Sequence, residues 1–172
     1  MNNIDIKKAL SELNKELKFV HASDTIYTLG GAALYLLGYE DRATVDVDDL
    51  RPVMQGTIFE CAKRVAKTLG IDDFWLNTGV APLVKNFEKN WKQKCQLVFS
   101  DTHLKVYAVD RQTLINTKLA AACNRSESDT EDLKWLKPSQ QEMQTAKKYV
   151  QTAEKNVPEV VIDANINEVL SE

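Results

Sequence analysis

The residues best suited to chemistry are a pair of aspartates two positions apart, Asp46 and Asp48. They lie in the segment Arg42–Leu50, which predicts a β-strand because valines alternate with polar residues over Ala43–Asp48. Side chains two positions apart on a strand project from the same face, so these carboxylates would repel each other unless a cation lay between them. Carboxylate oxygens suit Mg²⁺ or Mn²⁺. The pair predicts a metal site, although a solvated strand edge has the same pattern, and Asp49 would project from the opposite face.

Two glycines stand before this strand, Gly30 and Gly31, directly after the segment Asp24–Leu29. That segment is rich in β-branched and aromatic residues and predicts another strand, and the apolar run Ala32–Leu37 predicts a short helix after the glycines. Backbone N–H groups at such a turn can bind phosphate oxygens, and glycine allows both a positive φ and a close approach. The order predicts a phosphate-binding turn beside a metal site. The alternative is a turn that needs glycine for its backbone alone.

These motifs resemble those of a known superfamily. Leu29–Gly31 followed by Asp46–Asp48 is similar to the motif of the polymerase-beta-type nucleotidyltransferases. The longer string Arg42–Asp48 resembles the R-x-T-x-D-h-D pattern of the AbiEii-like abortive-infection toxin nucleotidyltransferases of prokaryotes. A second block, Lys118–Leu133, is similar to their K-L-x-A…R…D-x-x-D-L pattern, and Trp75–Asn77 to a segment common in these relatives. The resemblance spans about residues 25–136.

The resemblance implies a role for each matching residue. Implied metal ligands are Asp46 and Asp48; implied nucleotide-binding residues are Gly30, Gly31, Arg42, Thr44, Lys118 and Asp132; implied catalytic residues are Asp46, Asp48, Lys118 and Asp129. Lys118 would neutralise triphosphate charge. Asp129 and Asp132 would either orient Lys118 or act on the incoming hydroxyl. Arg42 would pair with an acid or a phosphate, and Thr44 would support it.

The activity that the resemblance implies is metal-dependent transfer of a nucleoside monophosphate from a nucleoside triphosphate (NTP) to an acceptor, with Mg²⁺ or Mn²⁺ as cofactor. The acceptor could be RNA, including tRNA ends, a protein or a small molecule, and the toxin relatives suggest an antitoxin protein as partner. Many superfamily members place a third carboxylate in a later strand, but Leu104–Val109 contains none. Either Asp129 substitutes for it, or the site is incomplete. An incomplete site would favour a non-catalytic nucleotide-binding or regulatory module.

The remaining pattern predicts an α/β (α+β) fold of the nucleotidyltransferase type. We expect a mixed sheet of about four or five strands flanked by helices, with an internal aspartate-bearing strand and a helical C-terminal part. Residues 1–110 would form the core, and residues 111–172 would complete the same domain. The further predicted elements are helices over Ile4–Leu17, Ile58–Leu69, Asp110–Cys123, Asp129–Leu136 and Ser139–Lys155, a hairpin of Gln96–Ser100 with Leu104–Val109, and a loop with a short helix over Asp72–Phe87.

Composition limits the class of protein. The chain has 172 residues and a formal net charge of −3, which argues against broad electrostatic binding of nucleic acid or anionic membranes. One local exception is a set of lysines around Trp91, which could bind RNA or form an ordinary solvated face: Lys85, Lys89, Lys92 and Lys94. The three cysteines are widely spaced, and no apolar run approaches the ~20 residues of a membrane span. We therefore expect a cytoplasmic protein with reduced thiols and no membrane partner.

Overall fold

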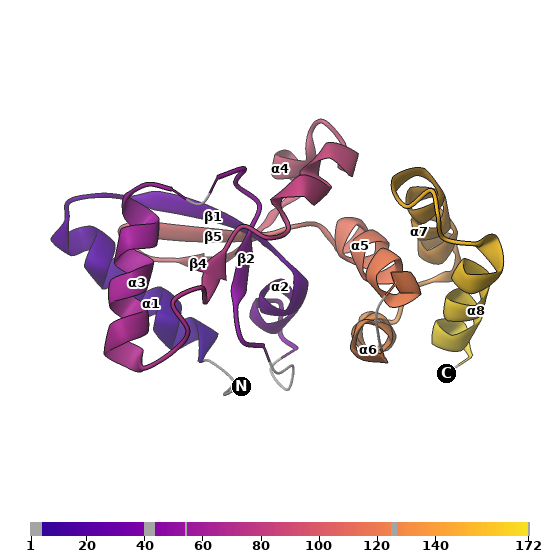
Figure 1. The fold of residues 1–172 in the computed structure, drawn as a ribbon, viewed down its shortest axis with the longest axis horizontal. Helices are drawn as coiled ribbons and strands as arrows, with labels where there is room; N and C mark the ends of the chain where they lie inside the picture. Colours follow the sequence, from indigo (N-terminus) through magenta and orange to yellow (C-terminus); the bar gives the residue numbers. More distant parts are fainter. Residues whose placement is uncertain (1–4, 40–43, 54, 125–126, 172) are drawn as a thin grey trace. The chain divides into compact units, whose positions relative to one another are not determined.

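The computed structural model describes residues 5–39, 44–53, 55–124 and 127–171. The chain divides into two compact units, Met1–Val109 and Asp110–Glu172, both drawn in Figure 1. All strands of the described residues belong to the first unit, whereas the described elements of the second unit are helices. Among these residues, no helix combines the length and the apolar character needed to cross a membrane.

A five-stranded mixed sheet forms the centre of the first unit. Its strands are β1 (Asp24–Leu29), β2 (Val47–Asp49), β3 (Leu76–Asn77), β4 (Gln96–Ser100) and β5 (Leu104–Ala108). In the order β3-β2-β1-β5-β4, β1 is parallel to β5 and β2 to β3, while the other two pairings are antiparallel. The predicted α+β fold with a mixed sheet is confirmed, and the aspartate-bearing strand β2 is internal, as expected.

One face of this sheet is buried beneath two helices, α1 (Ile6–Phe19) and α3 (Thr57–Leu69) (Figure 1). The residues of α1 that face the core recur at helical spacing, and all are fully buried: Ile6, Leu10, Leu13 and Leu17. Burial of each contributes about 2 kcal/mol. Gly70 ends α3 in a left-handed conformation with φ 67°. The buried indole of Trp75 donates to the carbonyl of Ala62 at 2.9 Å, which ties β3 to α3.

Three shorter elements complete the first unit: α2 (Gly30–Leu36), the 3₁₀ helix η1 (Ala81–Asn86) and α4 (Trp91–Lys94). Helix α2 packs on the α1 side, since Ala32 belongs to the same buried cluster and Lys7 of α1 lies 5.5 Å from the centroid of the Tyr35 ring. Tyr27 of β1 meets the Trp91 ring edge-on, with centroids 5.4 Å apart. Because Ile26 next to Tyr27 is buried in the core cluster, α4 lies on the opposite side of the sheet from α1, as Figure 1 shows.

The second unit contains four helices in its described residues: α5 (Arg111–Asn124), α6 (Glu127–Leu136), α7 (Gln140–Ala153) and α8 (Glu159–Leu170). Asp110 caps α5, because its carboxylate accepts hydrogen bonds from the Thr113 backbone N–H at 3.2 Å and from the Thr113 hydroxyl at 2.6 Å. Ser139 and Glu142 form the predicted capping box at the start of α7. Both predicted helix starts are therefore confirmed.

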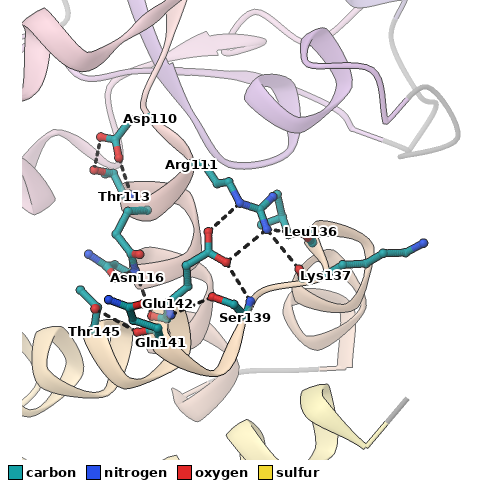
Figure 2. A network of polar contacts seen from close by, with 11 residues as sticks. Asp110, Arg111, Thr113, Asn116, Leu136, Lys137, Ser139, Gln141, Glu142 and Thr145 are labelled. Atoms are coloured by element: carbon teal, nitrogen blue, oxygen red, sulfur yellow. Dashed lines mark hydrogen bonds and ion pairs between the residues drawn. The ribbon is translucent and has the colours of Figure 1, made fainter.

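Arg111 connects three of these helices (Figure 2). Its guanidinium donates to the Glu142 carboxylate at 2.7 Å, and also to the carbonyls of Leu136 at 2.7 Å and Lys137 at 3.2 Å. These two carbonyls stand at the end of α6, where backbone acceptors have no intrahelical partner. One side chain thus stabilises the start of α7 and the end of α6 together.

Two elements differ from the sequence prediction. Among the described residues of the predicted strand Arg42–Leu50, β2 covers only Val47–Asp49, because its partner β1 ends at Leu29, which pairs with Asp48, and the chain then turns into α2. Ladder pairing with β1 therefore stops at Asp48. The second difference is β3, which lies in the segment predicted as a loop with a short helix and is too short to show a strand period.

Candidate functional site

The first group of candidate residues lies where β1 turns into α2. Gly30 has a φ of +73°, in the left-handed region that side chains disfavour. A Cβ atom at Gly30 would lie only 3.1 Å from Oδ2 of Asp48. The turn therefore needs glycine for two reasons, its backbone conformation and its close approach to a carboxylate. Gly31 follows within the first turn of α2.

Asn77 of β3 is a neighbour of both Asp46 and Asp48. Asp48 pairs with Asn77 in the β2–β3 register, so their side chains share a face of the sheet. The Asn77 amide donates to Oδ2 of Asp46 at 3.2 Å. Its own oxygen accepts from the Gly79 N–H at 2.8 Å, which fixes the amide nitrogen toward Asp46. Thr44 supports the same segment, since its hydroxyl donates to the Asp46 carbonyl at 3.2 Å.

The electrostatic setting of Asp46 disfavours its charged form. Burial raises the pKa of Asp46, the nearby charge of Asp72 raises it further, and the hydrogen bond from Asn77 lowers it only in part. A cation that reached this carboxylate would offset both unfavourable effects. The pair Asp46 and Asp48 supplies hard oxygen donors for such an ion.

On the opposite face of β2, a third aspartate, Asp49, has a structural role. Asp49 is 1% exposed and forms an ion pair with Arg51. Arg51 also donates to both carboxylate oxygens of Asp24, at 3.1 and 3.3 Å, and lies over the ring of Phe59. Asp49 thus projects away from the Asp48 side, as the alternation of a strand predicts.

The second group of candidates lies in the second unit. Lys118 of α5 pairs with Asp129 at 2.8 Å and with Asp132 at 2.6 Å, both on α6. The side chains of Lys118 and Asp132 are 10% and 1% exposed, so this ion-paired group is largely shielded from water. The two aspartates are three positions apart on a helix and therefore share a face. The predicted second block is a real spatial cluster.

The structure thus brings the predicted site residues together as two groups, one in each unit. Arg42 lies outside the described residues. Asn77, whose amide contacts Asp46, was not among the predicted site residues. The signal for it was the resemblance of Trp75–Asn77 to a segment of related proteins, because a strand of two residues leaves no pattern of its own.

The donor set is compatible with a metal ion bound together with a nucleotide. Magnesium sites that serve nucleotides use one or two carboxylates, and substrate phosphates and water complete the coordination. Asp46 and Asp48 match that requirement. Because Gly30 has no side chain, the space beside the Asp48 carboxylate stays open. In the described part of the chain, no group of three or more His, Cys, Asp or Glu residues forms a ready-made metal site.

The mixed sheet with flanking helices and its Gly-Gly turn beside paired aspartates are features of a nucleotidyltransferase-like protein. Comparison with known families places the chain more closely. Residues 7–168 match DUF6036, a family described as a nucleotidyltransferase of unknown function, and the chain belongs to this family. Searches of the curated proteins and of the solved structures found no match to this chain. The family match supports the resemblance to the nucleotidyltransferase superfamily at the level of the superfamily.

Proposed function

We propose that this protein is a metal-dependent nucleotidyltransferase that moves a nucleoside monophosphate from an NTP to an acceptor hydroxyl. The observation that carries the proposal is the arrangement of Asp46, Asp48 and Gly30. Asn77 donates to one carboxylate and pairs in register with the other aspartate, and a Cβ atom at Gly30 would lie only 3.1 Å from Oδ2 of Asp48. Membership of a nucleotidyltransferase family supports the same chemistry.

In this proposal, Asp46 and Asp48 would hold Mg²⁺ or Mn²⁺, which when bound supplies neutralisation of triphosphate charge. Asn77 would orient the Asp46 carboxylate through the bond it already donates. The backbone at Gly30 and Gly31 would approach the phosphates. The acceptor hydroxyl oxygen would attack the α-phosphorus as the bond to pyrophosphate breaks, and its proton would leave to water.

The second group of residues would supply positive charge. By the resemblance, Lys118 would neutralise triphosphate charge as a point cation, and Arg42 and Thr44 would be supporting residues. Of the two roles open to Asp129 and Asp132, the ion pairs with Lys118 favour the first, which is to orient its ammonium group. A lysine held by two carboxylates loses less side-chain freedom when it meets a phosphate.

A second candidate function is nucleotide binding without transfer. The observation in its favour is that β5 (Leu104–Ala108) carries no carboxylate, whereas many superfamily members have a third one on a later strand. Under this alternative the chain would keep the fold and the nucleotide and serve as a regulatory module. The two candidates differ in whether pyrophosphate is released.

The test is thermal unfolding with Mg²⁺ and each of the four NTPs. Wild type is compared with Asp46→Asn/Asp48→Asn and with a control of equal charge change at exposed positions, Asp73→Asn/Asp101→Asn. We expect metal-dependent stabilisation of wild type and control by about 2.7 kcal/mol at 100 times the dissociation constant, and none for the first variant. Absence of stabilisation by any NTP at millimolar concentration would contradict the proposal. Stabilisation without pyrophosphate release, across trials with RNA, protein and small-molecule acceptors, would select the second candidate.

The resemblance to AbiEii-like toxins extends the proposal to the cell. A toxin of this kind would slow the growth of a bacterial host that expresses it, and a cognate antitoxin protein would restore growth. Expression of wild type beside Asp46→Asn/Asp48→Asn tests this directly, because both proteins have the same fold and differ only in the proposed metal ligands. Equal growth of the two strains would argue against the toxin role and leave the transfer chemistry open to the test above.

A further inference from the structure

The face of the sheet that carries Asp48 also carries an aromatic pair. Leu29 is opposite Asp48 in the β1–β2 register, and Tyr27 lies two positions earlier on the same face. Tyr27 is opposite Tyr107 in the parallel β1–β5 register, and their rings stack at 5.4 Å with planes 20° apart. Leu97 of β4 is opposite Tyr107 and is 47% exposed. A stripe of side chains on one face of the sheet thus leads from Asp48 past the buried Leu29 to Tyr27, Tyr107 and Leu97 at the sheet edge.

A lysine is held over this stripe by the rings themselves. The ammonium of Lys92 lies 5.0 Å from the ring centroid of Tyr27 and 5.6 Å from that of Trp91. Trp91 is only 9% exposed, and Phe87 packs edge-on against it at 5.7 Å. Trp91 is therefore the buried support of the surface. The partly exposed Tyr27 and Tyr107 and the exposed Lys92 are the groups that can meet a ligand.

The segment around this stripe, residues 81–107, is basic, whereas the whole chain is acidic. Residues 81–107 contain five of the 22 lysines and arginines of the chain but only two of its 25 acidic residues. The lysines concerned are Lys85, Lys89, Lys92, Lys94 and Lys105, and all five are exposed. In a protein with a formal net charge of −3, this stretch is therefore basic, and two of its lysines lie at the aromatic stripe: Lys92 over Tyr27, and Lys105 two positions before Tyr107 on the same face of β5. Such a surface attracts a polyanion, and it does so locally.

We propose that this surface, defined as Tyr27, Lys89, Lys92, Leu97 and Tyr107 with Trp91 as its buried support, binds single-stranded RNA as the acceptor strand. The inference rests on the proposed transferase function. Unpaired bases stack on aromatic rings while lysines contact the phosphates, and this combination is how proteins hold single strands. The stripe leads toward Asp48, so a strand lying on it would direct one end to the proposed metal site. A duplex offers no free base faces and would gain little from the tyrosines.

The first test measures binding of a fluorescent single-stranded oligoribonucleotide by anisotropy over a range of salt concentrations. Lys89→Gln/Lys92→Gln is compared with Lys18→Gln/Lys67→Gln, which removes the same charge from exposed positions on α1 and α3. We expect weaker binding for the first variant only. The slope of log K against log salt should fall by about 1.4 in magnitude, because each lost single-strand phosphate contact removes about 0.7.

The second test addresses the rings. Tyr107→Leu keeps apolar bulk beside Tyr27 but removes the aromatic face, and we expect RNA binding to weaken at least about five-fold with an unchanged salt slope. Mg²⁺–NTP stabilisation should be the same in all of these variants as in wild type, which shows that they fold and keeps the two proposals separate. Loss of that stabilisation in wild type itself would be a failure of the proposed function.

Three results would overturn the RNA proposal while leaving the transferase proposal intact. One is Mg²⁺–NTP stabilisation with no measurable RNA binding, which would move the search to protein or small-molecule acceptors. Another is tighter binding of duplex RNA or of DNA of the same sequence than of the single-stranded RNA. The third is equal weakening by the Lys89/Lys92 and Lys18/Lys67 substitutions, because binding would then not reside on this surface.

Discussion

The two sides of one short strand treat aspartate in opposite ways. On one side Asp49 is fully enclosed, and Arg51 neutralises it while also holding Asp24 at the start of β1. On the other side Asp46, just before β2, has an amide hydrogen bond and a like charge, Asp72, as its main polar surroundings within the described residues. Burial raises the pKa of both Asp46 and Asp49, and Arg51 offsets part of that effect at Asp49. The comparison shows that one carboxylate of this segment is neutralised inside the protein, whereas the proposed function assigns the other two to a metal ion.

The largest effect should come from breaking the neutralised side. Arg51→Met leaves Asp49 buried without its guanidinium, and it also removes the bonds to Asp24 and to the Thr25 carbonyl. Removing one partner of a buried ion pair costs about 3 kcal/mol or more, because the remaining charge keeps its desolvation penalty. The free energy of unfolding from urea titration measures this loss.

A surface arginine provides the matched control for that change. Arg64 pairs with Glu16 across α3 and α1 at 2.6 Å, but its side chain is 45% exposed. Arg64→Met should cost at most about 1 kcal/mol, because exposed ion pairs contribute little. Equal losses for Arg51→Met and Arg64→Met would mean that Asp49 is not held as a buried charge, and the contrast between the two sides of β2 would fail.

An intermediate effect is expected at the glycine turn beside the proposed metal ligands. Gly30→Ala places a side chain at φ +73° and a methyl group 3.1 Å from Oδ2 of Asp48. The backbone conformation alone costs about 1–2 kcal/mol. Gly70→Ala pays the same backbone cost at φ +67° but meets no atom within 4 Å.

The pair of glycine variants separates folding from ligand binding. Both should unfold at similarly lowered temperatures, since the Asp48 carboxylate can move by a few tenths of an ångström to relieve the contact. Only Gly30→Ala should lose the stabilisation by Mg²⁺ and NTP, because the displaced carboxylate is a proposed metal ligand. If Gly30→Ala keeps the full ligand-induced shift in thermal unfolding, the close approach at Gly30 serves the turn alone.

The sequence was sufficient wherever a local pattern determined the structure. The alternation and turn of β4 and β5, the helical spacing of α1 and α3, and the capping box at Ser139 each depend on residues close together in the chain. The proximity of Gly30 to Asp48 could also be predicted, because two consecutive strands joined through a glycine turn are usually neighbours in a sheet. Local periodicity thus explains most of the first unit.

What could not be predicted depends on partners distant in the sequence. The start of β2 is set by where β1 ends, and β3 exists only because β2 offers it an edge. Asn77 reaches Asp46 across 31 positions, and Arg51 reaches Asp24 across 27. No periodic signal marks such contacts, since each is a single residue whose role is created by the sheet order.

The smallest effect, and the most direct measure of the side that carries the proposed metal ligands, is the pH dependence of stability at Asp46. The pKa of Asp46 is raised in the folded protein above the ordinary value of 3.8. The stabilisation that comes from the protonated Asp46 is therefore fully present below pH 3.8 and is lost as the pH rises through the raised pKa. Asp46→Asn cannot ionise, so wild type should lose stability relative to this variant as the pH rises from about 4 toward neutrality. Chemical denaturation at a series of pH values without divalent ions measures the difference. Mg²⁺ with an NTP should reverse this loss of stability in wild type only, because the bound metal ion would place a positive charge beside the Asp46 carboxylate. A difference that does not change with pH would show that Asp46 is solvated like a surface residue, and the distinction between the two sides of the strand would then rest on Arg51 alone.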